Sequence, residues 1–452
     1  MSGTSDPQAS LEGIERREFL RLTGAGGAIG LLAGALPGRA APPAEKRRPN
    51  VVLIISDDQG WTDYGFMRHP TIRTPRLDRL ASQSLVLSRA YVPTALCRPS
   101  LATLSTGRYP HRHGIVGNDP KGGSRDLAGR RRMIERFKES PSLAALLARA
   151  GYVSFQAGKW WEGHHRNGGF TAGMTHGDPK RGGRHGDAGL TIGRKGLRPI
   201  ADFLDGTGGK PFFLWYAPFL PHTPHNPPKR LLSKYTAPGR PLPVARYYAM
   251  CQWFDETCGA LLDMLDKRHL AEETLVVYVC DNGWVQGPRP PGAFGGRRGK
   301  RTPYEKGVRT PILLRWPGKV RPRREEKALA SSIDVVPTIL AACGLAPPRE
   351  MPGVNLLDAA ALARRKAVFG AAFAHDVADL ARPESSLKTR WCIEGRWKLL
   401  LHHAPRGRKG TAELYDVLAD PHEKADLAAK NPDRVERLKK LLDAWWAVSA
   451  KQ

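Results

Sequence analysis

Cysteine is scarce in this sequence, and its spacing follows no familiar pattern. The six cysteines stand at positions 97, 251, 258, 280, 343 and 392. They form neither a paired Cys-x-x-Cys zinc site nor the dense, regular spacing of a disulfide framework. On a helix, Cys251 and Cys258 would lie two turns apart, which is too far for a disulfide. We therefore expect neither a zinc-organised nor a disulfide-stapled fold.

Acidic residues are outnumbered by basic ones. The 452 residues include 71 Lys and Arg against 43 Asp and Glu, which gives a formal net charge of +28. Such a charge suits a polyanionic partner, whether nucleic acid, acidic lipid or a sulfated glycan. The basic stretches, for example residues 130–132 and 297–301, are short and scattered, and no nucleic-acid-binding motif accompanies them. We therefore expect a solvated basic surface and no specific nucleic-acid partner.

The N-terminal region lacks a hydrophobic run long enough to span a membrane. Its apolar run at residues 24–36 has about 13 residues, whereas a bilayer needs about 20. The pair Arg16-Arg17 precedes this run, and a small-residue stretch ends near Ala40-Ala41. This order is typical of a twin-arginine export signal, so we expect residues 1–41 to be a signal peptide. The twin-arginine machinery of a bacterium would then export the folded chain to the periplasm or the exterior.

Four short apolar runs are each followed by polar residues. Residues 51–55, 153–156, 212–216 and 275–280 have the pattern of buried strands. The residues that follow them are, in order, Asp57-Asp58, Gly158-Lys159, a loop rich in Pro and His, and Asp281-Asn282-Gly283. In open α/β sheets, ligands bind outside the carboxyl ends of the strands. We therefore expect these four strand ends to place polar groups at one site.

The character of the sequence changes from about residue 389. Residues 390–401 are typical of a strand hairpin, residues 413–416 begin another short element, and residues 435–448 have the pattern of an amphipathic helix. With 41% hydrophobic residues, the chain is long enough to form one large α/β domain and a smaller α+β unit.

A series of short motifs runs in order along most of the chain. They are Pro49-Asn50-Val51 before Asp57-Asp58, Thr74-Pro75-Arg76-Leu77-Asp78-Arg79-Leu80, Cys97-Arg98-Pro99-Ser100, Thr106-Gly107-Arg108, Ala157-Gly158-Lys159-Trp160, Pro221-His222-Thr223-Pro224, Asp281-Asn282-Gly283, Gly299-Lys300, Tyr304-Glu305-Lys306-Gly307-Val308-Arg309, and Leu414-Tyr415-Asp416 with Asp420-Pro421. Their order and spacing, from about residue 49 to 428, resemble the type I, formylglycine-dependent sulfatases of the alkaline-phosphatase superfamily. The resemblance implies a large mixed sheet flanked by helices, in a catalytic domain at 49–385, and a small C-terminal α+β subdomain at 386–452.

The resemblance also implies a calcium ion. Its ligands would be Asp57, Asp58, Asp281 and Asn282, together with the modified residue at 97. A hard divalent cation held by oxygen ligands stabilises the charge that develops on sulfonyl oxygens. Taken singly, Asp57-Asp58 also fits a helix cap and residues 281–283 a turn. Their joint position at strand ends within one matching frame favours the metal site.

Cys97 is implied to be the source of the nucleophile. In the family a formylglycine-generating maturation enzyme oxidises this Cys to formylglycine (3-oxoalanine), whose hydrated aldehyde attacks sulfur and also binds the metal. Pro99 favours a helix through Leu104, whose N-terminal amide groups would face an anion. Without the surrounding motif, a lone Cys would be interpreted as a small buried hydrophobe.

Three further residues match family positions that hold the sulfate or move protons. Lys159 and Lys300 would stabilise negative charge, and His222 or Lys300 would protonate the leaving alcohol. Outside these motifs, a Lys in so basic a chain would be interpreted as a surface charge, and a His between prolines as a loop residue.

Two positions depart from the family pattern. Leu101 stands where the family has an Arg that lies near the formylglycine and helps the maturation enzyme to recognise the segment. Trp161 stands where the family has a His that helps to break down the covalent sulfate intermediate. The joint change fits either a divergent branch with a repacked pocket or lost activity. Glu162, His164 and His165 follow Trp161, and any of them could substitute as a base.

The sequence therefore predicts hydrolysis of sulfate esters, with a sulfated carbohydrate as the anionic substrate. Two alternatives are a phosphodiesterase or phosphonate hydrolase of the same superfamily and an inactive binder of sulfated polymers. Retention of the four metal ligands and both lysines argues against the inactive binder. We expect substrate specificity to reside in loops such as 117–135 and 163–195, which contain the Gly- and Arg-rich segments 121–132 and 181–187.

Overall fold

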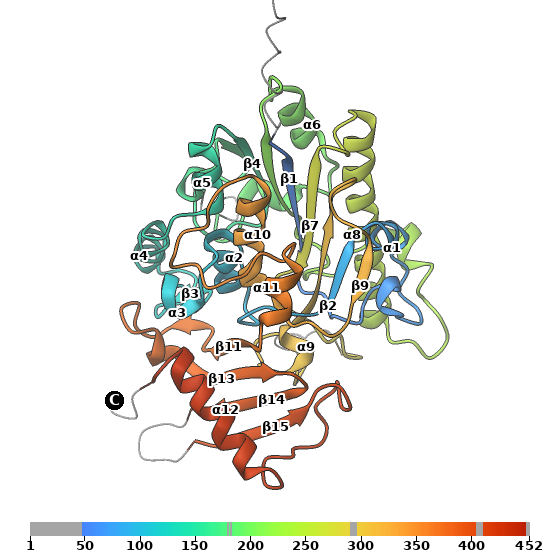
Figure 1. Cartoon of the computed structure of the whole chain (residues 1–452). Helices are drawn as coiled ribbons and strands as arrows, with labels where there is room; N and C mark the ends of the chain where they lie inside the picture. Colours follow the sequence, from blue (N-terminus) through green and yellow to red (C-terminus); the bar gives the residue numbers. More distant parts are fainter. Residues whose placement is uncertain (1–47, 179, 181–182, 290–295, 404–409, 449–452) are drawn as a thin grey trace, which may run out of the picture. The chain divides into compact units, whose positions relative to one another are not determined.

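A nine-stranded mixed sheet forms the centre of the structure (Figure 1). The structure is a computed structural model and describes residues 48–178, 180, 183–289, 296–403 and 410–448. The strand order is β10-β2-β8-β7-β1-β6-β4-β5, and β9 pairs with β2. The bounds are β1 Asn50–Ser56, β2 Leu85–Tyr91, β4 Val153–Gly158, β5 Ala172–Gly173, β6 Phe212–Ala217, β7 Thr274–Cys280, β8 Arg309–Arg315, β9 Arg323–Glu325 and β10 Ala330–Ser331. The predicted signal peptide, residues 1–41, lies outside the described residues.

The middle of this sheet is parallel. Strand β1 pairs in parallel with β7 on one side and with β6 on the other, and β4 continues the parallel set beside β6. Strand β8 is antiparallel to both β7 and β2, so the sheet is mixed. The predicted large mixed α/β sheet is therefore confirmed, and four carboxyl ends meet along one edge.

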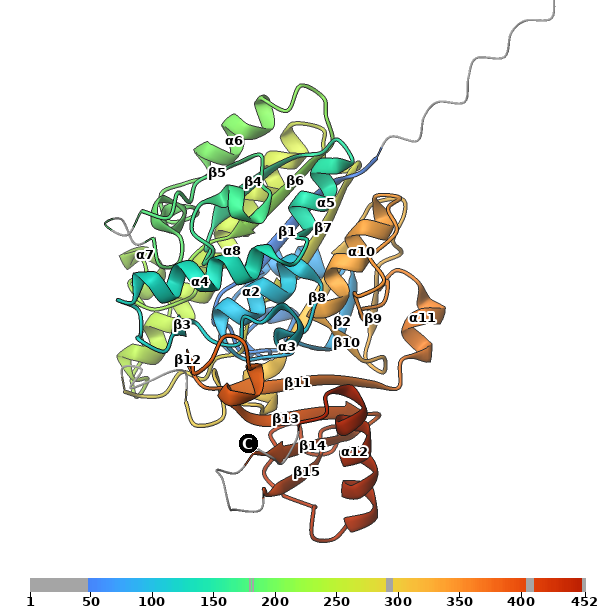
Figure 2. The ribbon, with the colours of Figure 1, turned by 90° about the vertical axis from the view of Figure 1, so that its left-hand side faces the viewer.

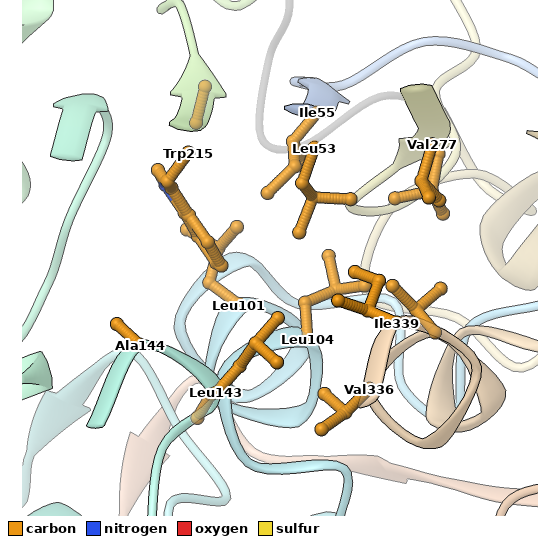
Figure 3. Close-up of a cluster of buried hydrophobic side chains, with 14 of the residues drawn as sticks. Leu53, Ile55, Leu101, Leu104, Leu143, Ala144, Trp215, Val277, Val336 and Ile339 are labelled. Atoms are coloured by element: carbon orange, nitrogen blue, oxygen red, sulfur yellow. The ribbon is translucent and has the colours of Figure 1, made fainter. Parts of the chain in front are cut away.

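Both faces of the sheet are covered by helices because β1 is apolar on both sides. Val51, Leu53 and Ile55 pack against one set of helices, and Val52 and Ile54 against the other. The first set is α2 Cys97–Thr106, α5 Leu143–Arg149 and α10 Val335–Ala342; the second is α1 Pro75–Ser82, α6 Arg198–Asp205 and α8 Leu242–Lys267. Figure 3 shows the first interface, where side chains of β1, β6 and β7 meet those of α2, α5 and α10.

A second, antiparallel sheet follows in the sequence. Its order is β11-β13-β14-β15, with bounds Ala367–Phe373, Leu387–Glu394, Trp397–His402 and Ala412–Asp416. Helix α12 Pro432–Trp445 covers it through Leu438 and Leu442, which pack on apolar residues of β13, β14 and β15 (Figure 2). The predicted hairpin is formed by β13 and β14, and residues 48–452 belong to one compact unit. The division at residue 385 stays a prediction.

This second sheet contacts the first part of the chain through apolar and charged groups. Trp391, Ile393 and Leu400 share a buried cluster with Tyr91 and Val308. The Nζ atom of Lys398, fully buried on β14, lies 3.1 Å from Glu305 Oε1 and 2.9 Å from Glu423 Oε1. Glu305 opens α9 Glu305–Val308, the helix that follows the segment of Lys300.

The sequence prediction of a loop at 121–132 is wrong in its second half. Residues Leu127–Lys138 form helix α4, whose N-cap Asp126 accepts a hydrogen bond from Gly129 N at 2.7 Å. Met133 and Phe137, one turn apart, are buried and hold the helix to the core. This periodicity is hard to recognise in the sequence because charged residues, four of them Arg, occupy half of the twelve positions of the helix. The helix after Cys97 also starts at Cys97 itself and not at Pro99.

The remaining α-helices and strands of the described residues are short. They are α3 Pro110–His113, α7 Lys229–Leu232 and α11 Ala359–Arg364, and a two-stranded parallel sheet of β3 Asp119–Pro120 and β12 Asp376–Val377. Among the described residues, every helix is too short or too polar to cross a bilayer.

Candidate active site

Four strand ends and one loop bring the predicted site residues together. Strand β1 ends before Asp57 and Asp58, β4 before Lys159, and β7 before Asp281 and Asn282. The chain that leaves β6 carries His222, and Lys300 lies ahead of α9. All of these except the partly exposed His222 are buried. The predicted meeting of the four strand ends is thus observed.

Glycine at the end of β4 allows Lys159 to turn toward the site. Gly158 has φ 108°, and a Cβ atom there would lie 2.0 Å from the backbone oxygen of Ala217 on β6. A side chain is therefore excluded by both the backbone conformation and the close approach of the neighbouring strand. Lys159 N in turn donates to Ala217 O at 2.7 Å.

The acidic and amide groups form a tight oxygen cluster. Asp58 is held in the left-handed region, with φ 63°, while its N–H donates to Asp281 Oδ1 at 3.1 Å. Asn282 Nδ2 donates to Asp58 Oδ1 at 2.7 Å. Three buried oxygens of this cluster accept no hydrogen bond within the described structure: Asp57 Oδ2, Asp281 Oδ2 and Asn282 Oδ1. Buried oxygens without donors are costly unless a cation satisfies them, so the donor set fits a hard ion such as calcium.

Two lysines balance the acids. Lys159 Nζ lies 2.6 Å from Asp57 Oδ1 and 3.5 Å from Asp281 Oδ2, and Lys300 Nζ lies 2.7 Å from Asp58 Oδ1. Burial acts to lower the pKa of Lys159, but Asp57 and its other anionic neighbours outweigh burial and hold that pKa well above the ordinary value. For Lys300, burial is likewise outweighed by Asp58, which raises its pKa, so both lysines carry positive charge beside the oxygen cluster.

Cys97 lies next to this cluster at the first turn of α2. Its Sγ atom is 4.0 Å from Asp58 Oδ1, and single ligand atoms of Asp57, Asp58, Cys97 and His222 all lie within 4.8 Å of one another. Burial raises the pKa of the Cys97 thiol to about 12, despite the opposing charges of Lys159 and Lys300. His222 Nε2 is 3.4 Å from Asp58 Oδ2.

A pocket of about 420 Å³ opens above these groups. Asp58, Cys97, His222 and Lys300 lie at its base. Its remaining walls include two aromatic side chains and several cationic or neutral nitrogen-bearing groups: Trp161, Trp284, Arg184, His185, Arg301 and His375. The volume is in the range of small-molecule sites, and the mixture of aromatic rings and donors suits a polar, anionic ligand.

The two unusual positions do not leave gaps in this pocket. Leu101 is buried in the apolar cluster beneath the sheet and does not line the pocket (Figure 3). Arg98, the residue after Cys97, instead forms a buried bidentate pair with Glu162, with Nε–Oε1 at 2.9 Å and Nη2–Oε2 at 2.6 Å. The segments of Cys97 and Trp161 are therefore joined by this ion pair.

The substitutes suggested for the missing His lie elsewhere. Glu162 is engaged with Arg98, and His164 and His165 cluster with His176, away from the residues that line the pocket. The structure places His185 there instead, with its ring centroid 5.4 Å from that of Trp161. Burial, followed by the charges of Lys159 and Arg184, lowers the pKa of His185 to about 3, so its imidazole is neutral. No motif marks His185 in the sequence, since it lies in a Gly- and Arg-rich segment.

Known proteins share both the sequence pattern and the fold. Residues 49–345 match the family model described as Sulfatase, and residues 295–447 match the C-terminal region of N-sulphoglucosamine sulphohydrolase. The chain is 31% identical to human N-acetylgalactosamine-6-sulfatase over 350 residues, 68% of this chain and 65% of that protein. It is 32% identical to human arylsulfatase A over 369 residues, 70% of this chain and 68% of that one.

A solved structure extends the likeness to the fold. The phosphonate monoester hydrolase of Agrobacterium radiobacter matches with a TM-score of 0.65 at 19% identity, over 88% of this chain and 95% of its own. The family model covers well over half of the chain, including every residue of the oxygen cluster. The chain therefore belongs to the sulfatase family, whose members are sulfuric ester hydrolases with an alkaline-phosphatase-like fold.

Proposed function

We propose that this protein hydrolyses a sulfate ester of a sulfated carbohydrate, with a nucleophile derived from Cys97. The observation that carries the proposal is the position of Cys97, which lines one pocket with Asp58 and Lys300 and lies next to a buried cluster with three unsatisfied oxygens and two charged lysines. The carbohydrate is supported by the similarity to human N-acetylgalactosamine-6-sulfatase, whose name specifies a sulfated sugar.

The proposed cofactors are calcium and formylglycine at residue 97. Asp57, Asp58, Asp281 and Asn282 would hold the ion, which supplies positive charge to the sulfonyl oxygens. Formylglycine supplies an oxygen nucleophile and a route to sulfate release that a thiol lacks. A formylglycine-generating enzyme would act on the segment at Cys97, although Leu101 replaces the Arg that such enzymes recognise.

The remaining steps rest on the side chains of this chain. Lys159 and Lys300 hold the anionic ester by charge-assisted hydrogen bonds and stabilise the negative charge that builds up on it. His222 or Lys300 delivers a proton to the departing alcohol. His185, neutral and in the pocket wall, accepts the proton that must be removed when sulfate is released. A bound anion near His185 would raise its pKa toward neutrality and so strengthen it as a base.

The test combines the state of residue 97 with sulfate release. The protein is produced together with a formylglycine-generating enzyme. The mass of the peptide that contains residue 97 is measured by mass spectrometry, and the turnover of 4-nitrophenyl sulfate and of a sulfated disaccharide is measured in parallel. We expect formylglycine at 97, loss of turnover in a chelator with recovery on added calcium, and a fall on the order of a thousandfold or more in Cys97→Ala.

Two results would contradict the proposal. Turnover with an unmodified thiol at residue 97, or turnover that survives chelation, would exclude the proposed nucleophile or metal. Faster cleavage of a phosphodiester or phosphonate monoester than of any sulfate ester would favour the superfamily's phosphorus chemistry. Absence of turnover on every ester, with tight binding of sulfated polymers, would indicate an inactive binder.

A further inference from the structure

A second pocket, of about 500 Å³, is lined by arginines and lies beside the active-site pocket. Four guanidinium groups line it, those of Arg125, Arg130, Arg131 and Arg184, and no carboxylate among the described residues does so. We call it the arginine pocket. Its volume is larger than that of the active-site pocket, so it can accommodate a sugar residue with its substituents.

Helix α4 supplies most of this lining because of its residue spacing. Leu127, Arg130, Arg131 and Ile134 stand at helical positions i, i+3, i+4 and i+7 and so share one face of the helix. Leu127 is exposed to 48%, which leaves apolar surface next to the cations. A pyranose ring has both an apolar face and polar substituents, so this mixture matches a charged sugar better than a free inorganic anion.

The carboxylates of this region are already engaged. Asp126 caps α4, Asp119 forms a bidentate pair with Arg184, and Glu162 is paired with Arg98. Arg130 is held in place by a 2.9 Å hydrogen bond to Gly183 O, and burial lowers its pKa only to about 10, so it remains charged. Arg125 and Arg131 are exposed and form no ion pair within the described structure. The pocket therefore has an uncompensated positive charge.

Arg184 connects this pocket to the active site. It lines both pockets, its Nε donates to Asp119 Oδ1 at 2.9 Å, and its guanidinium lies 4.9 Å from the centre of the Trp161 ring. The residue is thus fixed by two partners and forms part of the wall between the pockets. A ligand that extends past Arg184 would reach the arginine pocket.

We propose that the arginine pocket binds a second anionic group, a sulfate or a carboxylate, on the sugar next to the one whose sulfate ester is cleaved. The proposal rests on the function proposed above and specifies its substrate as an oligosaccharide with at least two anionic groups. Guanidinium groups suit this task because their planar forks match the oxygens of sulfate and carboxylate. Arg125 and Arg131 supply the contacts, Arg130 adds fixed charge, and Arg184, paired with Asp119, forms the wall toward the active site.

The experiment compares one double variant with a matched control. Arg125→Ala/Arg131→Ala removes two exposed arginines of the pocket. Arg132→Ala/Arg149→Ala removes two exposed arginines that line neither pocket, so the loss of net charge is equal. Kinetics are measured with a sulfated disaccharide that carries a second anionic group and with 4-nitrophenyl sulfate, which has no such group.

We expect the pocket variant to raise KM for the disaccharide by about tenfold or more, the effect of losing charge-assisted hydrogen bonds. Its kcat for the disaccharide and both constants for 4-nitrophenyl sulfate should stay within about twofold of wild type, as should all constants of the control. Equal losses on both substrates, or an equal effect of the control, would overturn the proposal.

A binding measurement separates this proposal from the proposed function. Calorimetry with the Cys97→Ala protein, which does not need turnover, should show that the disaccharide binds and that Arg125→Ala/Arg131→Ala weakens this binding by a similar factor. If the wild-type protein shows no catalysis, the proposed function is refuted. The calorimetric binding measurement would still show whether the arginine pocket binds the disaccharide. Failure of the disaccharide to bind, or equally tight binding of a single-stranded oligonucleotide through the same arginines, would refute the pocket's assignment.

Discussion

At the scale of single residues, Arg98 and Glu162 form a buried ion pair between the two segments that carry the unusual positions. Each follows one of the reactive segments, Arg98 after Cys97 and Glu162 after Trp161, and their buried bidentate pair joins these segments. Removing either partner would leave a buried charge without compensation, which typically costs about 3 to 5 kcal/mol. Leu101 and Trp161 belong to the same buried cluster, although 60 residues separate them in the sequence.

The sequence could predict the oxygen cluster but not the whole pocket. Asp57, Asp58, Asp281 and Asn282 directly follow apolar strands, and adjacent parallel strands bring such residues to one edge. His185 and Arg184 come instead from a long connection whose path depends on tertiary contacts, such as the hydrogen bond from Trp160 N to His185 O at 3.1 Å. No local sequence pattern predicts that such residues will line the pocket.

A residue-scale prediction concerns His185. If its imidazole accepts the proton during sulfate release, His185→Ala should lower steady-state turnover by about a hundredfold, the usual contribution of a general base. Release of the alcohol in the first turnover should remain fast, so stopped-flow measurements should show a burst of product followed by a slow phase. His164→Ala, outside the pocket, is the control. If His164→Ala lowers turnover and His185→Ala does not, His185 is not the base and this assignment is wrong.

At the scale of elements, continuous apolar runs were the reliable signal. Strands β1, β6 and β7 are buried on both faces, so their sequences are apolar throughout and their ends are sharp. The sequence pattern does not reveal helix α4 because only one side of it is buried and most of its other positions are charged. The extent of a half-buried helix depends on the surface it packs against, which the sequence alone does not show.

An element-scale prediction concerns the contact between β15 and the segment before α9. Glu413 on β15 accepts hydrogen bonds from Tyr304 at 2.9 Å and Tyr415 at 2.5 Å, and it lies 2.9 Å from His402 Nε2. The hydrogen bond with His402 is the main cause that lowers the pKa of Glu413 to about 2, from an ordinary value of 4.5. A carboxyl group with a lowered pKa stabilises the fold above its unfolded pKa, and this stabilisation is lost as the pH falls toward the folded pKa.

Solvent screens the interactions of the partly exposed Glu413, so Glu413→Gln should reduce the free energy of unfolding by about 1 to 2 kcal/mol near pH 6.5, and by clearly less near pH 3.5. Urea unfolding at the two pH values measures the difference. Glu436→Gln, at an exposed position on α12, should show no such pH dependence. If Glu413→Gln lowers the free energy of unfolding by the same amount at both pH values, the hydrogen bonds of Glu413 stabilise the fold and its ionisation does not.

At the scale of the whole molecule, the N-terminal sequence bears on how the protein reaches its location. The Arg16-Arg17 pair and the short apolar run that follows it support a twin-arginine signal. We propose that the folded protein is exported by this route. Folding before export would allow residue 97 to be modified in the cytoplasm.

The corresponding prediction is that Arg16→Lys/Arg17→Lys traps the precursor inside the cell. Arg21→Lys, which keeps the pair intact, is the control and should be exported as wild type is. Fractionation of the bacterial host and the mass of the exported chain provide the measurement, with cleavage expected close to Ala41. Arrival of the mature double variant outside the cytoplasm would show that residues 1–41 are not a twin-arginine signal.

The position of Arg184 between the two pockets has a consequence for how a polymer would be processed. The residue is pinned by Asp119 and Trp161, so the spacing between the base of the active site and the arginine pocket is fixed. If the arginine pocket binds the second anionic group as proposed, a sulfate would be bound most tightly for cleavage where the neighbouring sugar carries its charge at the matching distance. Removal of sulfate would then follow the sulfation pattern of the oligosaccharide and slow down at a sugar whose neighbour is uncharged.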